Sequence, residues 1–190
     1  MWSESLALPA NPATSCRCSR VGLFHLQGGL QVKTETLVDD DPEDSAYHEA
    51  GHAVVSCLLG MVFECVSVDP WPERPETGGF IHFPPRKLTN IQEVKNEIIQ
   101  ACAGSVGADL MPNRTREVPY FTIQEDIEQA QHFAFQISSD PYNLLNQCFQ
   151  KARELLDTHL EALHRVAAAL LKHRRLDYAA VAEIVQQALN

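Results

Sequence analysis

The chain has 190 residues and a formal net charge of −10, from 25 acidic and 15 basic side chains. This length fits one domain of ordinary size, and an apolar fraction of 45 % is enough to build its core. The acidic balance argues against nucleic acid and anionic membrane surfaces as partners, because both repel negative charge. No stretch reaches the roughly 18 apolar residues of a membrane-spanning helix, so we expect no span.

Residues 1–38 show no sustained hydrophobic period and are interrupted by proline and glycine, which predicts a loosely structured N-terminal arm. The first residues lack the basic region of a secretory signal, which favours a cytoplasmic location. A segment rich in Ser, Arg and Cys at 15–20 leaves an organelle stroma as the alternative. Cys16, Cys18 and His25 match no standard zinc spacing. The four later cysteines have apolar neighbours and are expected to be reduced core residues.

Helix and strand signals follow this arm. Asp41 can cap a helix, and Pro42 suits the first helical turn. Gly60 provides a stop, so the spacing predicts a helix between these signals. Alternating residues at 64–69 and 79–83, joined by a turn-rich connection, predict two short strands of a small antiparallel sheet.

The rest of the chain shows the apolar spacing of helices. One helix is ended by Pro112, and the next is broken by Asp140 and Pro141. The apolar stripe of this second helix is predicted to consist of Ile123, Ile127, Ala130, Ala134 and Ile137. From Tyr142 onward the pattern fits two successive helices or one bent helix, before Asp177 starts a final one.

The segment His48-Glu49-Ala50-Gly51-His52 lies within the first predicted helix. Histidines four residues apart lie on the same face of a helix, so both imidazoles can bind one ion, typically zinc. Glu49 can contact a water molecule on that ion and take its proton, which makes the water a nucleophile. Gly51 weakens the helix, and we expect it to permit the close approach of another backbone. The segment therefore predicts a catalytic zinc site.

Two histidines leave a catalytic zinc site one protein ligand short, because such sites normally have three protein ligands and a water. Leu58 stands six residues after the second histidine, where a third histidine is absent. A downstream carboxylate is then the expected third ligand. Spacing alone leaves many acids open: Glu64, Glu73, Glu76, Glu93, Glu97, Asp109, Glu125, Asp126 and Glu128.

The segment 46–55 resembles the zinc-peptidase domain of the FtsH proteases, which are membrane-bound enzymes with an ATPase module. Three further segments are similar to parts of that domain: the strand, loop and edge strand at 66–83, the small-residue helix at 98–110, and the acidic segment at 124–130. The C-terminal helices also match, so the resemblance covers roughly residues 42 to 188.

The resemblance implies a mainly α fold with a small antiparallel β-sheet. This is the zincin-like FtsH peptidase-domain architecture with a C-terminal helical bundle. Residues 39–190 are expected to form this domain, with a metal-site subdomain at 39–140 and the C-terminal helices at 141–190. The resemblance also implies that Asp126 is the third zinc ligand.

The local sequence around this aspartate suggests how its helix begins. Thr122 and Glu125 match a capping box, which would place Asp126 in the first helical turn. The small-residue helix departs from the family pattern Gly-Gly-x-x-Ala-Glu-Glu at 103–109, where Ala108 replaces one acid and an aspartate shortens the other. We therefore expect fewer acidic side chains near the metal ligands to hold them in place.

The resemblance does not extend to the family's ATPase module or membrane anchor. We therefore expect an ATP-independent zinc metalloendopeptidase that hydrolyses unfolded or extended polypeptides. Its Zn²⁺ would be bound by His48, His52 and Asp126, and Glu49 would be its catalytic residue. The edge strand at 78–83 could receive a substrate strand, although it could equally be an ordinary sheet edge. The family's ring assembly makes a homo-oligomer possible.

Two other functions are open. A zinc-binding but non-proteolytic module, acting as an adaptor or assembly partner, would explain the altered acidic residues near the ligands. A helical scaffold that carries the motif by chance would bind no metal at all.

Overall fold

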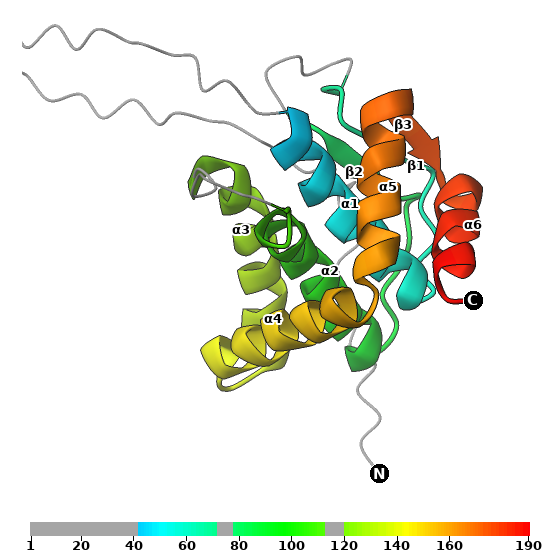
Figure 1. The fold of residues 1–190 in the computed structure, drawn as a ribbon. Helices are drawn as coiled ribbons and strands as arrows, with labels where there is room; N and C mark the ends of the chain where they lie inside the picture. The colour runs from blue at the N-terminus through cyan, green and yellow to red at the C-terminus, as the bar shows by residue number, and fades with distance from the viewer. Residues whose placement is uncertain (1–41, 72–77, 113–119) are drawn as a thin grey trace, which may run out of the picture.

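The computed structural model describes residues 42–71, 78–112 and 120–190, with the side chains of residues 120–124 left out of the description. The predicted N-terminal arm at 1–38 and the capping residue Asp41 lie outside the described residues. Figure 1 shows the elements, which are α1 (Pro42–Leu58), β1 (Cys65–Ser67), β2 (Phe80–His82), α2 (Ile91–Asp109), α3 (Tyr120–Ile137), α4 (Pro141–Thr158), α5 (Leu160–His173), β3 (Arg175–Asp177) and α6 (Tyr178–Ala188).

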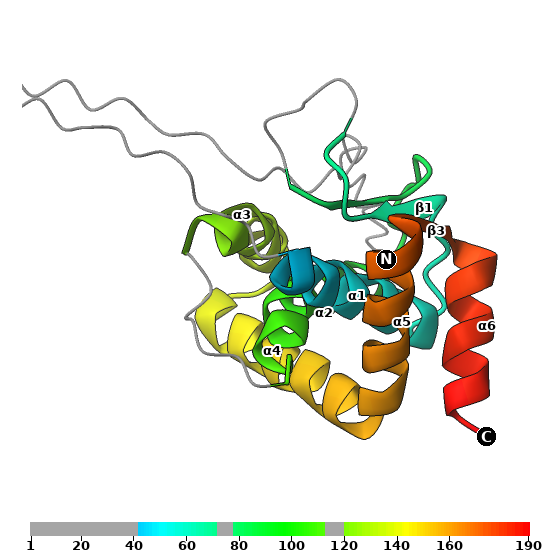
Figure 2. The same cartoon turned by 45° about the horizontal axis from the view of Figure 1, so that its top comes forward.

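Helix α1 lies at the centre of the molecule (Figure 1) and packs against α2, α5 and α6. Helix α2 packs in turn against α3 and α4. In Figure 2 the small sheet runs along one side of α1, and α4 crosses on the other side. The predicted fold class, mainly α with a small antiparallel sheet, is confirmed. The helix that carries the histidine motif is therefore surrounded by other elements.

Helix α1 has the boundaries that its sequence signals predict. It begins at Pro42, and Gly60 follows its end with a φ of +69°, a left-handed conformation that favours glycine. Every residue at 46–56 is buried. A helix that is buried all round cannot show a strong apolar stripe, and polar groups on it must find partners inside the protein.

The sheet has three strands in the order β2-β1-β3, and both pairings are antiparallel. Val66 in the middle of β1 lies opposite Ile81 of β2 and Leu176 of β3. The sequence pattern does not predict β3, because three residues are too few to show a period. This strand forms where Arg174 ends α5 in the left-handed conformation, with a φ of 64°. The Arg174 guanidinium also pairs with Asp69 at 2.7 Å, which holds the turn beside β1.

Small residues allow α1 and α2 to approach closely. A Cβ atom at Gly51 would overlap the carbonyl oxygen of Ala103 and would lie 3.1 Å from the Cα atom of Gly107. A Cβ atom at Gly107 would overlap the carbonyl oxygen of Tyr47. These neighbours are backbone atoms and cannot move aside without shifting a helix. The expectation that Gly51 permits a close backbone approach is confirmed.

Helix α3 starts earlier than its capping signal indicates. It begins at Tyr120, so the predicted capping box of Thr122 and Glu125 at its start is wrong. Asp126 consequently lies in the second turn of the helix, where the field of the helix dipole is weaker than at its start.

The buried stripe of α3 also differs from the predicted one. Ile127 is 38 % exposed, whereas its neighbour Asp126 is only 4 % exposed. The buried positions of this helix include Asp126, Ala130, Phe133 and Ala134. An apolar period cannot anticipate an acid that faces the interior, because burial of a carboxylate is favourable only where other polar groups meet it. Helix α3 is thus rotated so that Asp126 faces the interior and Ile127 the surface.

The C-terminal half consists of separate helices and not of one bent helix. His159 lies between α4 and α5, and its Nδ1 lies 2.7 Å from the carbonyl oxygen of Leu155. Asp177 caps α6 as predicted, since its Oδ1 accepts a hydrogen bond of 2.8 Å from the amide of Ala180. Helices α5 and α6 pack on α1, whereas α4 packs mainly on α2 and α3.

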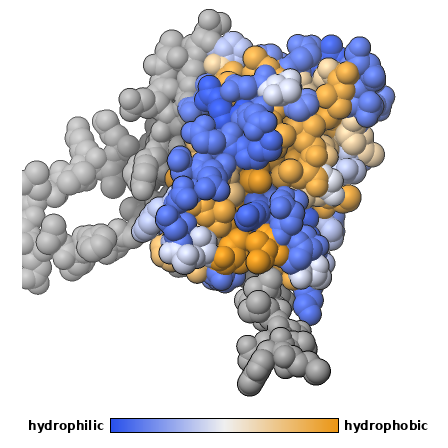
Figure 3. Space-filling view, turned by 90° about the horizontal axis from the view of Figure 1, so that it is seen from below, coloured by the Kyte–Doolittle hydropathy of each residue, from blue (hydrophilic) through white to orange (hydrophobic). Residues whose placement is uncertain are grey.

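Figure 3 shows the underside, where hydrophobic residues form patches between hydrophilic ones. The exposed large apolar side chains are Val62, Ile91, Ile127, Phe135, Tyr142, Leu160, Leu171 and Leu189. Within the described ranges, no helix combines the length and the apolar character needed to cross a membrane. The four cysteines of these ranges are free thiols, as expected.

Candidate metal centre

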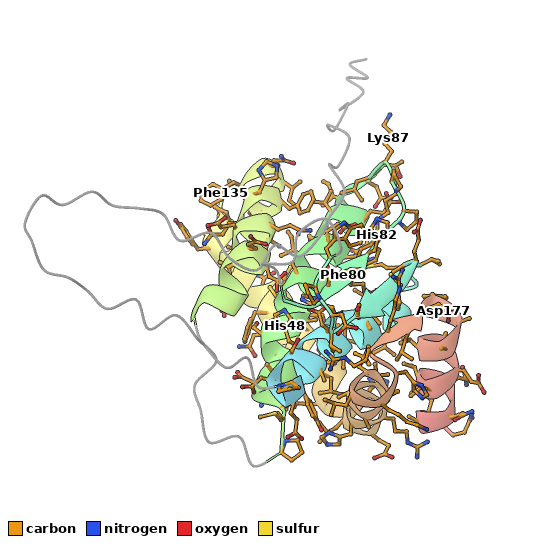
Figure 4. All side chains as sticks on the ribbon, turned by 90° about the horizontal axis from the view of Figure 1, so that it is seen from above. His48, Phe80, His82, Lys87, Phe135 and Asp177 are labelled. Atoms are coloured by element: carbon orange, nitrogen blue, oxygen red, sulfur yellow. The ribbon has the colours of Figure 1, made fainter. Side chains whose placement is uncertain are left out.

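Helix α1 presents the two histidines of the motif on one face. His48 and His52 are one helical turn apart, and both are buried. Their Nε2 atoms lie 3.1 Å from each other. Figure 4 shows His48 near the middle of the molecule, beside the ribbon of α1. The local spacing of the sequence is therefore enough to bring the two imidazole nitrogens together.

Helix α3 brings a carboxylate to the same point from 74 residues away. The Oδ2 atom of Asp126 lies 3.1 Å from Nε2 of His48 and 3.2 Å from Nε2 of His52. Metal–ligand bonds of about 2.0–2.1 Å in a tetrahedral site separate neighbouring ligand atoms by roughly 3.3–3.4 Å. The three observed separations are close to this value, so one zinc-sized ion fits between the three atoms.

The hydrogen bond of His52 supports the same assignment. Its Nδ1 lies 2.8 Å from the backbone carbonyl oxygen of Gln100, which can only accept, and 3.2 Å from the Gln100 side-chain Nε2; the nearer carbonyl favours a proton on Nδ1. Once Nε2 has lost its own proton, its lone pair points at Asp126 and His48. Lone pairs and a carboxylate oxygen that converge in a buried place repel one another unless a proton or a metal cation lies between them. Metal-binding histidines typically have such a donor bond on their other nitrogen.

The charges of this group of three side chains also favour a bound cation. Burial disfavours the charged form of His52, but the carboxylates of Asp126 and Glu49 together with the Gln100 carbonyl outweigh burial and raise the pKa of His52 to about 9. Burial alone would raise the pKa of Asp126, yet His52 and His48 hold that pKa well below its ordinary value. The group therefore attracts positive charge, as a site for a divalent cation must.

Glu49 lies beside this group without belonging to it. Its side chain is 2 % exposed, and its Oε2 atom has no hydrogen-bond partner among the described residues. Burial raises the pKa of Glu49 to about 7, although the charges of His48 and His52 act in the opposite direction. A buried carboxylate oxygen with no partner is costly, and proximity to a nucleophilic water would give it one.

Gly79, at the start of the β2 segment, lies directly against Glu49. A Cβ atom there would lie 2.6 Å from Cγ and 2.7 Å from Oε1 of Glu49. The backbone just before β2 thus passes over the carboxylate, and no side chain separates the two. This contact places the edge of the sheet next to the candidate metal group.

The other described acids left open by the sequence do not join the two histidines in this group. Glu64 pairs with His82 at 3.0 Å and Glu97 pairs with Arg86, whereas the exposed Asp109 at the end of α2 lines the same pocket as Asp126. Glu73 and Glu76 lie outside the described residues. Among the described residues, Asp126 is the acid that joins both histidines in a possible metal group.

Two contributors to this centre have no clear signal in the sequence. Gln100 acts through its backbone carbonyl, which every residue type carries, so no pattern reveals it. Gly104 lies in a stretch of small residues that marks close packing but not its purpose. Its Cα faces the imidazoles: a Cβ atom there would lie 2.6 Å from Nε2 of His48 and would overlap Nε2 of His52.

Gly104→Ala is expected to weaken zinc binding by roughly a hundredfold or more, because the added methyl group displaces both imidazole nitrogens directly. Zinc affinity, measured by competition with a chelating dye, checks this result. Ser105→Ala on the next position of α2 is the matched control and should retain the affinity of the unaltered protein. Equal affinities for the two variants would show that the ligands do not need the space beside Gly104.

Known proteins with sequences similar to this chain are proteases. No family model matches the chain. It is 23 % identical to the ATP-dependent zinc metalloprotease FtsH 1 of Thermoanaerobacter sp., over 78 % of this chain and 31 % of the relative. It is 25 % identical to an ATP-dependent zinc metalloprotease FtsH of Streptococcus pneumoniae, over 78 % of this chain and 28 % of the relative. A component of the mitochondrial inner membrane m-AAA protease of Saccharomyces cerevisiae is 30 % identical over 43 % of this chain and 11 % of its own length.

The fold is mainly helical with a small antiparallel sheet, and together with the buried group it is consistent with an FtsH peptidase-like domain. The chain is weakly homologous to FtsH zinc metalloproteases, which supports a family of zinc peptidases. It spans about three-tenths of the length of the curated relatives it matches.

Proposed function

We propose that this chain is a zinc metalloendopeptidase that hydrolyses peptide bonds of unfolded or extended polypeptides without ATP. The observation that carries the proposal is the convergence of three ligand atoms within 3.2 Å of one another, with the partnerless Oε2 of Glu49 beside them. In this proposal His48, His52 and Asp126 hold the zinc ion, and Glu49 is the catalytic residue.

The residues divide the chemistry between them. A bound zinc ion would supply Lewis acidity toward the peptide carbonyl and an acidified water. Glu49 takes a proton from the attacking water at Oε2, and it later delivers that proton to the amine leaving group. The carbonyl of Gln100 keeps His52 in one tautomer and one orientation throughout. The burial of the group excludes bulk water and strengthens these interactions.

The substrate class follows from the edge of the sheet. Strand β2 has β1 on one side only within the described sheet, and the segment before it passes over Glu49. A polypeptide in extended conformation could pair with that edge and bring a backbone carbonyl toward the metal. A folded protein cannot offer such a strand, so unfolded or extended chains are the proposed substrates.

ATP independence is proposed from the sequence, which shows no glycine-rich phosphate-binding loop. Substrates that are already extended need no motor to unfold them. A homo-oligomer and a cytoplasmic location stay predictions from the sequence.

A second function is supported by the end of α2. The family pattern has two acids where this chain has Ala108 and the exposed Asp109. A zinc-binding but non-proteolytic module, acting as an adaptor or assembly partner, would tolerate this loss of acidic support. Such a module has no need for Glu49, whose burial without a partner favours the peptidase.

The purified protein is expected to contain about one zinc ion per chain. It should cleave unfolded β-casein at the same rate with and without ATP. Chelation by 1,10-phenanthroline should stop cleavage, and added zinc should restore it, because the nucleophile depends on the ion. Zinc retention without cleavage would favour the adaptor, and a protein without affinity for zinc would contradict both functions.

A further inference from the structure

The edge strand β2 has few hydrogen bonds of its own to hold it in place. It has three residues, Phe80–His82, and among the strands of the described ranges it pairs with β1 alone. A ladder this short is weak without support from outside the sheet. In Figure 4 the labels of His48, Phe80, His82 and Lys87 follow one another outward from the middle of the molecule. The strand thus leads from the metal group toward the surface, and something must fix its outer end.

The outer end is held by an arginine in the connection to α2. The residues at 83–89 have no helix or strand. Within them, the Arg86 guanidinium carbon lies 4.6 Å from the ring centroid of the buried Phe83, directly after the strand. The same guanidinium pairs with the carboxylate of Glu97 on α2. Arg86 therefore links the end of β2 to a helix of the core.

The carboxylate of this pair is unusually deep in the protein. Glu97 is 1 % exposed, whereas both partners are exposed in the other lysine and arginine ion pairs of the described residues. Burial raises the pKa of Glu97, and the neighbouring Arg86 charge counteracts that rise. A buried ion pair adds little net stability over apolar residues of similar size, but it can specify one geometry. This pair is thus better suited to fixing the relative position of the segments it joins than to stabilising the fold.

The helix that receives this pair also orients a metal ligand. Glu97 precedes Gln100 by one helical turn, and the carbonyl of Gln100 accepts the hydrogen bond of His52. The two ends of the β2 segment thus contact α1 and α2, two helices that pack against each other. Gly79 rests on Glu49 at one end, and Arg86 reaches α2 at the other.

We propose that the Arg86–Glu97 pair is a positioning clamp that fixes the edge strand β2 over Glu49, so that an extended substrate pairs with it in one register. This inference rests on the proposed peptidase function. Arg86 and Glu97 are positioning residues: they act through β2 and do not touch the reacting atoms.

The test replaces the pair by apolar residues of similar size, Arg86→Met together with Glu97→Leu, a type of change that buried ion pairs often tolerate. The matched control is Arg165→Met with Glu161→Leu, which removes an exposed ion pair on α5. For an extended peptide of roughly ten residues, we expect KM to rise about ten- to hundredfold with a much smaller change in kcat. Zinc affinity and the cleavage of a blocked peptide too short to pair with β2 should match the control.

Hydrogen exchange provides a readout that does not depend on activity. The amides of β2 are expected to exchange about tenfold faster in the double variant, while those of α1 keep their protection. If the unaltered protein cleaves nothing, the proposed function fails, and hydrogen exchange still tests the clamp. Unchanged exchange in β2 would overturn the inference.

A loss of protection throughout the domain in both the double variant and Glu97→Gln would also overturn it. That result would show a structural role for the pair and not a positioning one. Glu97→Gln keeps the shape of the side chain and removes its charge, so we expect it to raise KM less than the double variant does.

Discussion

Glu49→Gln is expected to reduce peptide hydrolysis by roughly 10²–10⁴-fold while zinc binding persists. Glutamine has the size of glutamate but cannot accept a proton from water at neutral pH. The ligand atoms of His48, His52 and Asp126 are not altered by the change. The measurements are kcat on unfolded casein and the zinc content of the same preparation.

The control for this variant lies on the same helix. Glu43→Gln removes an equal charge from an exposed position in the first turn of α1, and it should leave kcat unchanged. Full hydrolysis by Glu49→Gln would rule out the assigned proton transfer, even if the protein proved to be a zinc peptidase. Loss of zinc together with activity would instead make Glu49 part of the ion's environment.

Asp126→Ala is expected to lower zinc affinity by more than about a hundredfold, because loss of a direct ligand should exceed the 10- to 100-fold cost of losing a supporting group. The same variant should lose the stabilisation by zinc, which is about 4 kcal/mol when free zinc is 1,000 times its Kd. Isothermal titration gives the affinity, and the thermal midpoint with and without zinc gives the stabilisation.

Glu128→Ala, two residues further along α3, is the comparison variant because it removes an exposed acid from the same helix. It should bind zinc as the unaltered protein does. Undiminished zinc binding by Asp126→Ala would mean that the two histidines bind zinc together with another of the acids that the sequence leaves open.

Much of the fold could be predicted because its signals are local. Pro42 and Gly60 delimit α1, and Asp177 caps α6, through hydrogen bonds within a few residues of each signal. The errors concern features that depend on distant contacts. Ile127 was expected in the apolar stripe of α3, but the helix turns Asp126 inward and leaves Ile127 38 % exposed. Strand β3 has too few residues to show a pattern.

By itself the sequence determined that two imidazoles lie on one helical face with a glutamate beside the first. That arrangement depends only on the 3.6-residue turn of the helix. Spacing left the acid that meets them open, the family resemblance pointed to Asp126, and the tertiary structure brings Asp126 to both histidines. A run of acidic candidates cannot be separated by spacing, because the position of each depends on how its helix packs.

Packing brings Asp126 within 3.2 Å of both histidines, across 74 residues in the case of His52. That approach requires α1 and α2 to lie close together, which Gly51 and Gly107 allow. It also requires a place beside Gly104 that no side chain fills. The histidine pair therefore belongs to one helix and its local geometry, whereas the complete candidate centre depends on contacts between α1, α2 and α3.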